Sequence, residues 1–247
     1  MAGFRQIARL TIDGLRTHYR DGQLVFWNYI FFLALLLLFV GTLGREPSVR
    51  VIMVSGIVTI ATMATALFSV GVGMSAARDR GSYRRLSMFP VPASRFLWAA
   101  VLWRWFVTFS SASILVVVAR VIFAVTWPGG AATWIAGLAV GAAAFCAIGF
   151  AAAGLARSSH RANAYVNGVF VPMLVLSGAA LPLGMLPDWA LPVSKVLPST
   201  ALVDVLQGAI IRGNGVSGTL GSLGCMAAWA IGAGLVGMVA WRRRGLM

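Results

Sequence analysis

The chain has 247 residues, of which 60% are hydrophobic and only 11% are charged. Its mean hydropathy of +0.88 lies far outside the usual range of soluble proteins, which excludes a soluble globular fold. The long apolar runs do not alternate with a period of two, which argues against an outer-membrane barrel. The composition therefore predicts an all-α integral membrane protein.

Six apolar runs are each long enough to cross a bilayer, which takes about 20 residues in a helix. They cover residues 25–43, 51–74, 96–125, 132–155, 162–181 and 219–241. The sequence therefore predicts six transmembrane helices in one domain over residues 25–247, with a separate segment, 1–24, before it. A GxxxG pattern at Gly137 and Gly141 predicts close helix contact, either inside this domain or at a dimer seam.

The basic residues fall unevenly on the two sides of such a domain. With the N-terminus inside, the inner segments hold fourteen of them and the outer segments hold four. Because cytoplasmic segments carry the excess of Lys and Arg, we expect both termini in the cytoplasm of a bacterial cell, with the spans in its cytoplasmic membrane. This topology explains the net charge of +14 without a nucleic-acid partner.

The first segment predicts an amphipathic helix over residues 3–21. An ideal helix gathers four arginines on one arc, and these are Arg5, Arg9, Arg16 and Arg20. Such a helix is expected to lie in the inner interface of the membrane, with its guanidinium groups toward lipid phosphates. It is a positive-inside anchor, a contact for a cytosolic partner, or both.

A basic loop, residues 75–95, joins the second and third runs. Residues 82–88 can form about two helical turns, which Pro90 and Pro92 end. A short surface helix held between two spans can transmit force from whatever docks on it. Topology alone would also explain its arginines.

The segment 182–218, before the last run, is too apolar for an ordinary loop and too broken by proline for a seventh span. Backbone at membrane depth needs its hydrogen bonds satisfied, so we expect short re-entrant helices that dip back from the outer face. Pro198 can begin one that ends at Gly213. The alternative is an amphipathic cap on the outer surface without a gating role.

The loop sequence ARDRGSYRRLSMFPVPASR, residues 77–95, resembles the cytosolic loop of permease subunits of type-2 ABC exporters, E-R-E-R-G-T followed by a hydrophobic residue and E-x-L-x-x-x-P. Ala77 and Arg84 stand where the family commonly has acids, which implies an unusually acidic partner surface. The matching residues are Arg78, Asp79, Arg80, Gly81, Ser82, Leu86 and Pro90. The resemblance implies that residues 78–86 form the ATPase-coupling site, namely Arg78, Asp79, Arg80, Gly81, Ser82, Tyr83, Arg84, Arg85 and Leu86.

A second match with the same family lies nearer the C-terminus. The chain has Ser177-Gly178 after the fifth run, then a proline-rich outer segment and a helix that begins at Pro198. Gln207 replaces the arginine that often follows. In the family such re-entrant helices form the outer gate, which implies gate residues Pro182, Pro187, Asp188, Trp189, Pro198 and Asp204.

The resemblance implies a permease subunit of an ATP-driven, drug-resistance-like exporter, and not an enzyme. No GxxxxGK[ST] motif is present, so ATP and Mg would be bound by two partner ATPase subunits, and this chain would hold no cofactor or metal. A second permease copy or a paralogue would complete a dimer in contact with membrane lipid. The expected substrate is amphipathic or hydrophobic: a drug, a lipid or a lipid-linked molecule.

Two other functions stay open from the sequence. A secondary transporter of another family is one, although no acid or histidine lies in a predicted membrane core to carry protons. A membrane assembly or scaffold subunit that uses the loop only for docking is the other. Arg104 and Arg120 are charges within the apolar runs, and both lie where they can extend to the interface.

Overall fold

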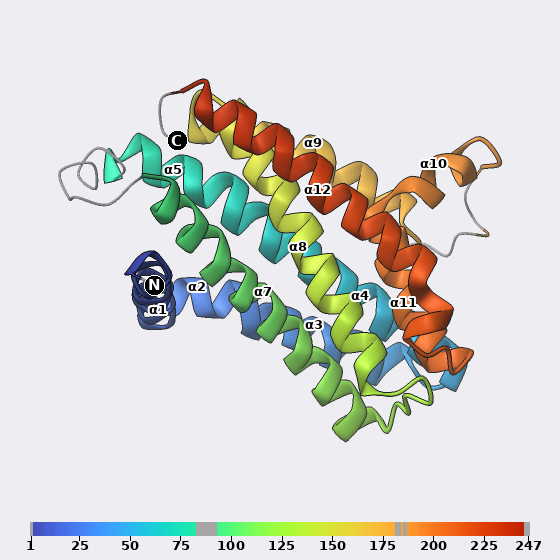
Figure 1. Ribbon diagram of the computed structural model, residues 1–247. Helices are drawn as coiled ribbons and strands as arrows, with labels where there is room; N and C mark the ends of the chain where they lie inside the picture. The colour runs from blue at the N-terminus through green and yellow to red at the C-terminus, as the bar shows by residue number, and fades with distance from the viewer. Residues whose placement is uncertain (1, 83–92, 181–183, 185–186, 245–247) are drawn as a thin grey trace.

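The computed structural model describes residues 2–82, 93–180, 184 and 187–244, and every regular element in these ranges is a helix. Figure 1 shows long helices lying side by side in one bundle, with a short helix pair, α10 and α11, at one end. The helices along the bundle are α2 (Gly22–Val25), η1 (Phe26–Ile30), α3 (Phe31–Leu43), α4 (Pro47–Leu67), η2 (Phe68–Val72), α5 (Gly73–Asp79), α7 (Ala93–Phe123), α8 (Ala131–Leu155), α9 (Ser159–Leu176) and α12 (Leu220–Arg242). The others are α1 (Ala2–Arg20), α10 (Ala190–Val196), α11 (Pro198–Ile211) and η4 (Val216–Thr219).

Five helices in the described ranges are long and apolar enough to cross a membrane. They are Gly22–Leu43, Pro47–Asp79, Ser94–Phe123, Ala131–Leu155 and Val216–Arg242. The first two each contain a π-helical turn, η1 or η2, between α-helical parts. Five of the six predicted runs therefore lie in helices of the required length and apolarity.

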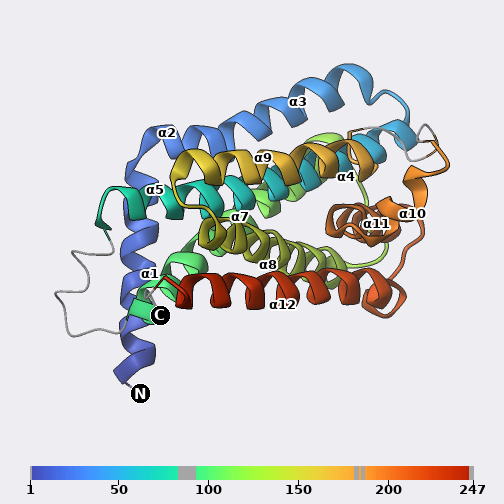
Figure 2. The ribbon, with the colours of Figure 1, turned by 90° about the horizontal axis from the view of Figure 1, so that it is seen from above.

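The remaining predicted run, the fifth along the chain at 162–181, corresponds to α9, which does not meet this criterion. Its first half carries polar side chains, namely His160, Arg161, Asn163 and Asn167, and its helix ends at Leu176. Its 18 residues still measure about 27 Å, close to the thickness of a hydrocarbon core. Figure 2 shows α9 running the length of the bundle, in contact with α4 and α8, and both termini at the same end. The six-span arrangement stays a prediction.

Asp21 makes the bend between α1 and the first apolar helix. Its backbone is extended, with φ −90° and ψ 99°, and its carboxylate accepts hydrogen bonds from the amides of Gln23 and Leu24. This N-cap begins a new helix and lets the chain change direction. Figure 2 shows the result, with α1 lying across the end of the bundle.

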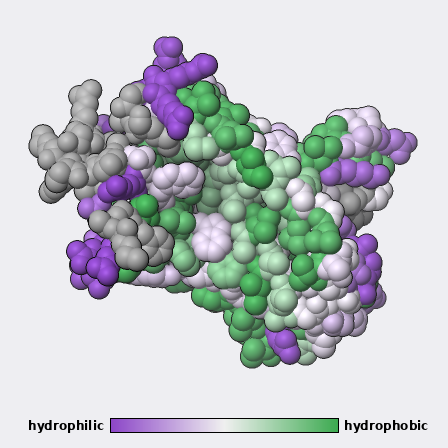
Figure 3. Space-filling model, in the orientation of Figure 1, coloured by the Kyte–Doolittle hydropathy of each residue, from purple (hydrophilic) through white to green (hydrophobic). Residues whose placement is uncertain are grey.

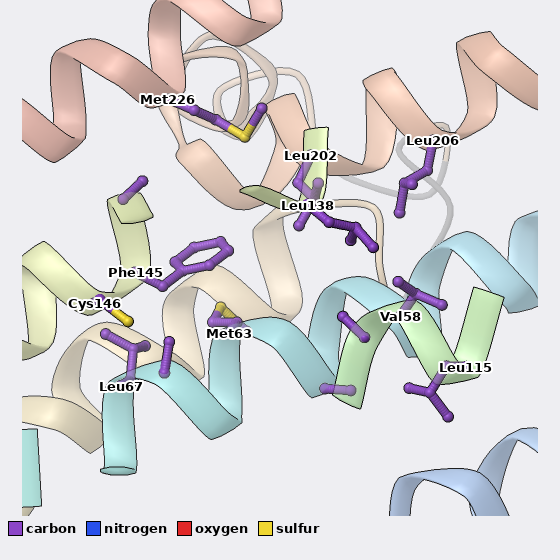
Figure 4. Close-up of a cluster of buried hydrophobic side chains, with 14 of the residues drawn as sticks. Val58, Met63, Leu67, Leu115, Leu138, Phe145, Cys146, Leu202, Leu206 and Met226 are labelled. Carbon is purple, nitrogen blue, oxygen red and sulfur yellow. The ribbon is translucent and has the colours of Figure 1, made fainter. Parts of the chain in front are cut away.

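The core lies where α4, α7, α8, α11 and α12 meet (Figure 4). Its labelled residues are Val58, Met63, Leu67, Leu115, Leu138, Phe145, Cys146, Leu202, Leu206 and Met226. The most apolar window of α8 is 67% buried, whereas that of α12 is 11% buried. Because lipid tails are as apolar as these side chains, close packing rather than hydrophobicity holds the centre together.

Small residues let α8 approach its neighbours. A Cβ on Gly137 would lie 2.7 Å from Cγ1 of Val205, and one on Gly141 would lie 3.1 Å from Cδ2 of Leu202. The GxxxG pattern therefore packs α8 against α11 within the chain. Of the two interpretations that the sequence left open, internal packing is the one found at these glycines.

Candidate coupling site and outer gate

Arg78 lies at the end of the helix Pro47–Asp79 and donates hydrogen bonds to the C-terminal end of α8. Its Nη1 donates to the carbonyl of Ala153 at 2.9 Å, and its Nη2 donates to the carbonyl of Ala156 at 2.8 Å. These carbonyls belong to the last turn of α8, where intrahelical donors run out and a cation is favoured. Its guanidinium carbon also lies 5.5 Å from the ring centroid of Trp241 in α12. Only 13% of the side chain is exposed, so Arg78 is a packed residue.

Asp79 makes the complementary contact with the start of α9. Its Oδ2 accepts a hydrogen bond of 2.6 Å from the amide of Ser159, in the first turn of that helix. Amides of a first helical turn lack intrahelical acceptors and favour an anion. Arg78 Nε lies 3.9 Å from Asp79 Oδ1. These two residues, which we name the α5 joint, therefore connect α5 with α8, α9 and α12.

The helix ends directly after the α5 joint. Gly81 has a φ of +72° and donates its amide to the carbonyl of Arg78, a left-handed conformation that glycine accepts without strain. Arg80 is exposed and Ser82 is half-buried. The other predicted coupling residues, Tyr83, Arg84, Arg85 and Leu86, lie outside the described residues, so the predicted surface helix stays a prediction.

The predicted N-terminal helix is present as α1, and it packs against α7. A Cβ on Gly14 would lie 2.4 Å from Cδ1 of Trp103, so the two helices touch at this glycine. Arg95 Nη1 donates to Oε1 of Gln6 at 2.6 Å. The four predicted arginines, Arg5, Arg9, Arg16 and Arg20, are exposed. Sequence reasoning missed the contact with α7, for which Gly14 in an otherwise bulky segment was the available signal.

Arg104 is turned into the bundle and does not extend to the interface as the sequence suggested. Its Nε donates to the carbonyl of Ser69 at 2.9 Å, its Nη1 donates to that of Ala100 at 2.8 Å, and 9% of the residue is exposed. Ser69 belongs to the π-helical turn η2, so Arg104 connects α7 with the middle of the helix Pro47–Asp79. The guanidinium also lies 4.0 Å from the ring centroid of Trp103. Arg120, in contrast, is exposed.

His18 of α1 is buried against α7, close enough to Arg104 to interact with its charge. The residue is 2% exposed, and its ring lies 5.7 Å from that of Trp103 and 6.4 Å from that of Tyr29. Within the described part of the chain its Nε2 has no hydrogen-bond partner. Burial lowers the pKa of His18, the charge of Arg104 lowers it further, and Asp21 partly opposes them. His18 is therefore neutral at pH 7.

At the other end of the bundle, α11 is held by polar side chains. Asp204 Oδ1 accepts from Arg212 Nη2 at 2.9 Å, and its Oδ2 accepts from Oγ of Ser222 in α12 at 3.0 Å. Gln207 Nε2 donates to Oγ of Ser55 in α4 at 3.2 Å. The sequence singled out Gln207 only as a departure from a pattern, whereas the structure gives it a contact between helices.

The remaining predicted gate residues are spread over the same end. Pro198 begins α11 and is buried. Pro187, Asp188 and Trp189 precede α10 and are exposed, Trp189 by 72%. Pro182 lies outside the described residues. A cavity of about 360 Å³ between α11 and α12 is lined by polar groups that include Lys195, Thr200, Asp204, Gln207 and Ser222.

The comparisons with known proteins agree with this architecture. A family model described as ABC-2 type transporter matches residues 5–211, which is well over half of the chain. The search of curated proteins found no match to this chain. The ABC-2 membrane domain is a transport permease without a catalytic domain. The chain therefore belongs to the ABC-2 type transporter family, as a multi-pass membrane permease.

Proposed function

We propose that this permease belongs to an ATP-driven exporter and that residues 78–86 receive the force from an ATPase subunit. The α5 joint is the observation that carries this proposal. The helix Pro47–Asp79 continues from the membrane part directly into the segment, and its last two residues hold the end of α8 and the start of α9. A displacement of the segment is therefore passed to three other helices at once.

In the proposed cycle, two ATPase subunits bind ATP and Mg and close on each other. The docked segments 78–86 of two permease chains approach, and the α5 joint carries this movement into α4, α8 and α9. The cleft between the permeases then opens to the outside and releases an amphipathic or hydrophobic substrate. The second permease is another copy of this chain or a paralogue.

The outer end acts as the gate in this proposal. Helices α10 and α11 are re-entrant from the outer face, and opening separates them from α12. The contact of Asp204 with Ser222 links α11 to α12 while the gate is closed, and the ion pair with Arg212 lies at the end of α11 itself. Both are contacts of an exposed carboxylate, so they can exchange for water at low cost.

The proposed orientation has both termini in the cytoplasm. It rests on the basic residues of the inner segments and agrees with the common end at which both termini lie (Figures 1 and 2). With this orientation α1 lies in the inner interface, and its exposed arginines face lipid phosphates or the ATPase.

Co-purification with the ATPase subunit tests the docking surface. Reversal of charge at Arg80 and Arg85 should abolish co-purification, because both positions are proposed to face an acidic partner surface. Arg45→Glu reverses an exposed charge at the opposite end of the bundle and serves as the matched control. Retained binding of the double variant would contradict the docking site, and uptake driven by a proton gradient without any ATPase would contradict the exporter.

A further inference from the structure

One apolar groove opens on the face formed by α7, α8 and α12, and none of its lining residues belongs to the proposed coupling segment 78–86 or to the proposed gate residues. Its volume is about 570 Å³, and its lining includes Trp105 of α7, Phe150 of α8 and Gly234 of α12. Figure 3 shows this face of the molecule as mostly apolar surface, with hydrophilic residues gathered toward the ends. These three helices are long and apolar enough to cross a membrane, so a groove on their outer face would face lipid.

The wall of the groove is preformed. Trp105 Nε1 donates to the carbonyl of Ala139 at 3.0 Å, and its ring stacks on that of Phe109 with an angle of 8°. The indole therefore presents an apolar face while its polar atom is bonded. On the opposite side, a Cβ built on Gly234 would have no atom within 4 Å, so the glycine leaves the groove open.

The length of the groove matches one leaflet. Along α8 its lining extends from Ala139 to Phe150, a rise of about 16 Å. Half of a hydrocarbon core is about 15 Å. A single acyl chain lying along α8 would therefore occupy the groove from the middle of the membrane to one surface.

Two arginines, one on α7 and one on α12, lie on the same helix faces as the groove lining and beyond one end of it. Arg95, whose Nη1 donates to Gln6 of α1, precedes the lining residue Leu102 by seven residues, which places the two within about 20° on α7. Arg242 follows the lining residue Ile231 by eleven residues, again within about 20° on α12. Arg95 lies in the first turn of α7, and Arg242 is the last residue of α12. Figure 1 shows these two helix ends on the side of the bundle where N and C are marked. Arg242 and the next residue, Arg243, are exposed.

We infer that this groove binds an anionic phospholipid, with one acyl chain along α8 and the phosphate near Arg95 and Arg242. The inference goes beyond the transport activity, since it needs neither an ATPase nor a substrate. The apolar wall recognises the chain, and the arginines select the negative head group. Each basic residue near an anionic surface contributes about 1 kcal/mol, which is a factor of about five in affinity.

Native mass spectrometry of the detergent-solubilised chain measures this binding directly. Phosphatidylglycerol and phosphatidylcholine with identical acyl chains compete for the unmodified protein. We expect phosphatidylglycerol to be retained preferentially, by more than tenfold. Equal retention of the two lipids would overturn the role of the arginines without any variant being made.

Two matched pairs of variants locate the site. Gly234→Phe fills the groove and should abolish retention, whereas Gly224→Phe, on the same helix and also with open space around it, should leave it unchanged. Arg242→Gln should lower the preference for phosphatidylglycerol about fivefold, whereas Arg45→Gln should not alter it. The inference would be overturned if Gly234→Phe retained as much phospholipid as Gly224→Phe. It would also be overturned if Ile231→Cys formed a disulfide with the same residue of a second copy of the chain.

Discussion

The two ends of the bundle are held by different kinds of contact. At the α5 joint, charged side chains bind backbone groups at the end of α8 and the start of α9, and Arg78 is mostly buried. At the other end, Asp204 binds the side chains of Arg212 and Ser222, and both members of its ion pair are more than half exposed. The partly buried bonds of Arg78 to the end of α8 fix an angle, and the exposed bond of Asp79 to Ser159 adds a second contact with a helix end. Exposed ion pairs between side chains are weak. We therefore propose that one end transmits movement and that the other yields.

Arg78→Ala should show the largest effect, because it removes two charged hydrogen bonds and leaves carbonyls of α8 without these donors. We expect a loss of about 2 to 4 kcal/mol in stability. Thermal unfolding followed by size-exclusion chromatography measures it. Arg80→Ala removes the exposed neighbour and should cost less than about 0.5 kcal/mol. Equal losses for the two variants would show that the α5 joint is not rigidly held.

Gly14→Ala should have the next largest effect, since its Cβ would lie 2.4 Å from a ring atom of Trp103. Relief of this overlap moves α1 away from α7 and should cost about 1 to 3 kcal/mol. Faster proteolysis within α1, measured beside thermal unfolding, checks the local nature of the change. Gly22→Ala is the matched control, because the space around Gly22 is open. Identical behaviour of the two would contradict the packing of α1 on α7.

Acid should weaken the contact of α1 with the bundle. The pKa of His18 is lower in the folded protein than its ordinary value of 6.5, so the unfolded chain binds more protons. Stability from this residue is therefore present above about pH 6.5 and is lost as the pH falls below it. Unfolding temperatures between pH 5 and 8 measure the effect. His18→Phe should flatten that part of the profile, and an unchanged profile would assign the dependence to other groups.

Asp204→Asn should have the smallest effect on stability. Its ion pair with Arg212 is exposed, so we expect a loss of about 0.2 to 1 kcal/mol. A double-mutant cycle with Arg212→Gln gives the coupling energy of the pair. A coupling as large as the loss from Arg78→Ala would contradict the contrast between the two ends.

Local sequence patterns predicted much of the architecture. Apolar runs of sufficient length predicted six spanning helices, and five of these runs lie in helices long and apolar enough to cross a membrane. Arginine spacing predicted α1, and Pro198 marked the start of α11. The polar side chains in the first half of α9 keep this helix below the apolarity expected of a membrane span, although the helix runs along the bundle. A pattern cannot show what touches a residue from a distant segment. For this reason the inward turn of Arg104 and the contact of Gln207 with Ser55 emerged only from the fold.

The central claim is that the α5 joint passes movement from a docked ATPase subunit to the membrane helices. The most direct test removes the joint while the ATPase stays bound. Spin labels on the exposed residues Val121 and Val196 report the distance between α7 and α10 in the complex with the ATPase. ATP should shift that distance in the unmodified protein, and Asp79→Ala, which loses the contact with Ser159, should abolish the shift while the ATPase still co-purifies. A full ATP-dependent shift in Asp79→Ala would contradict the account.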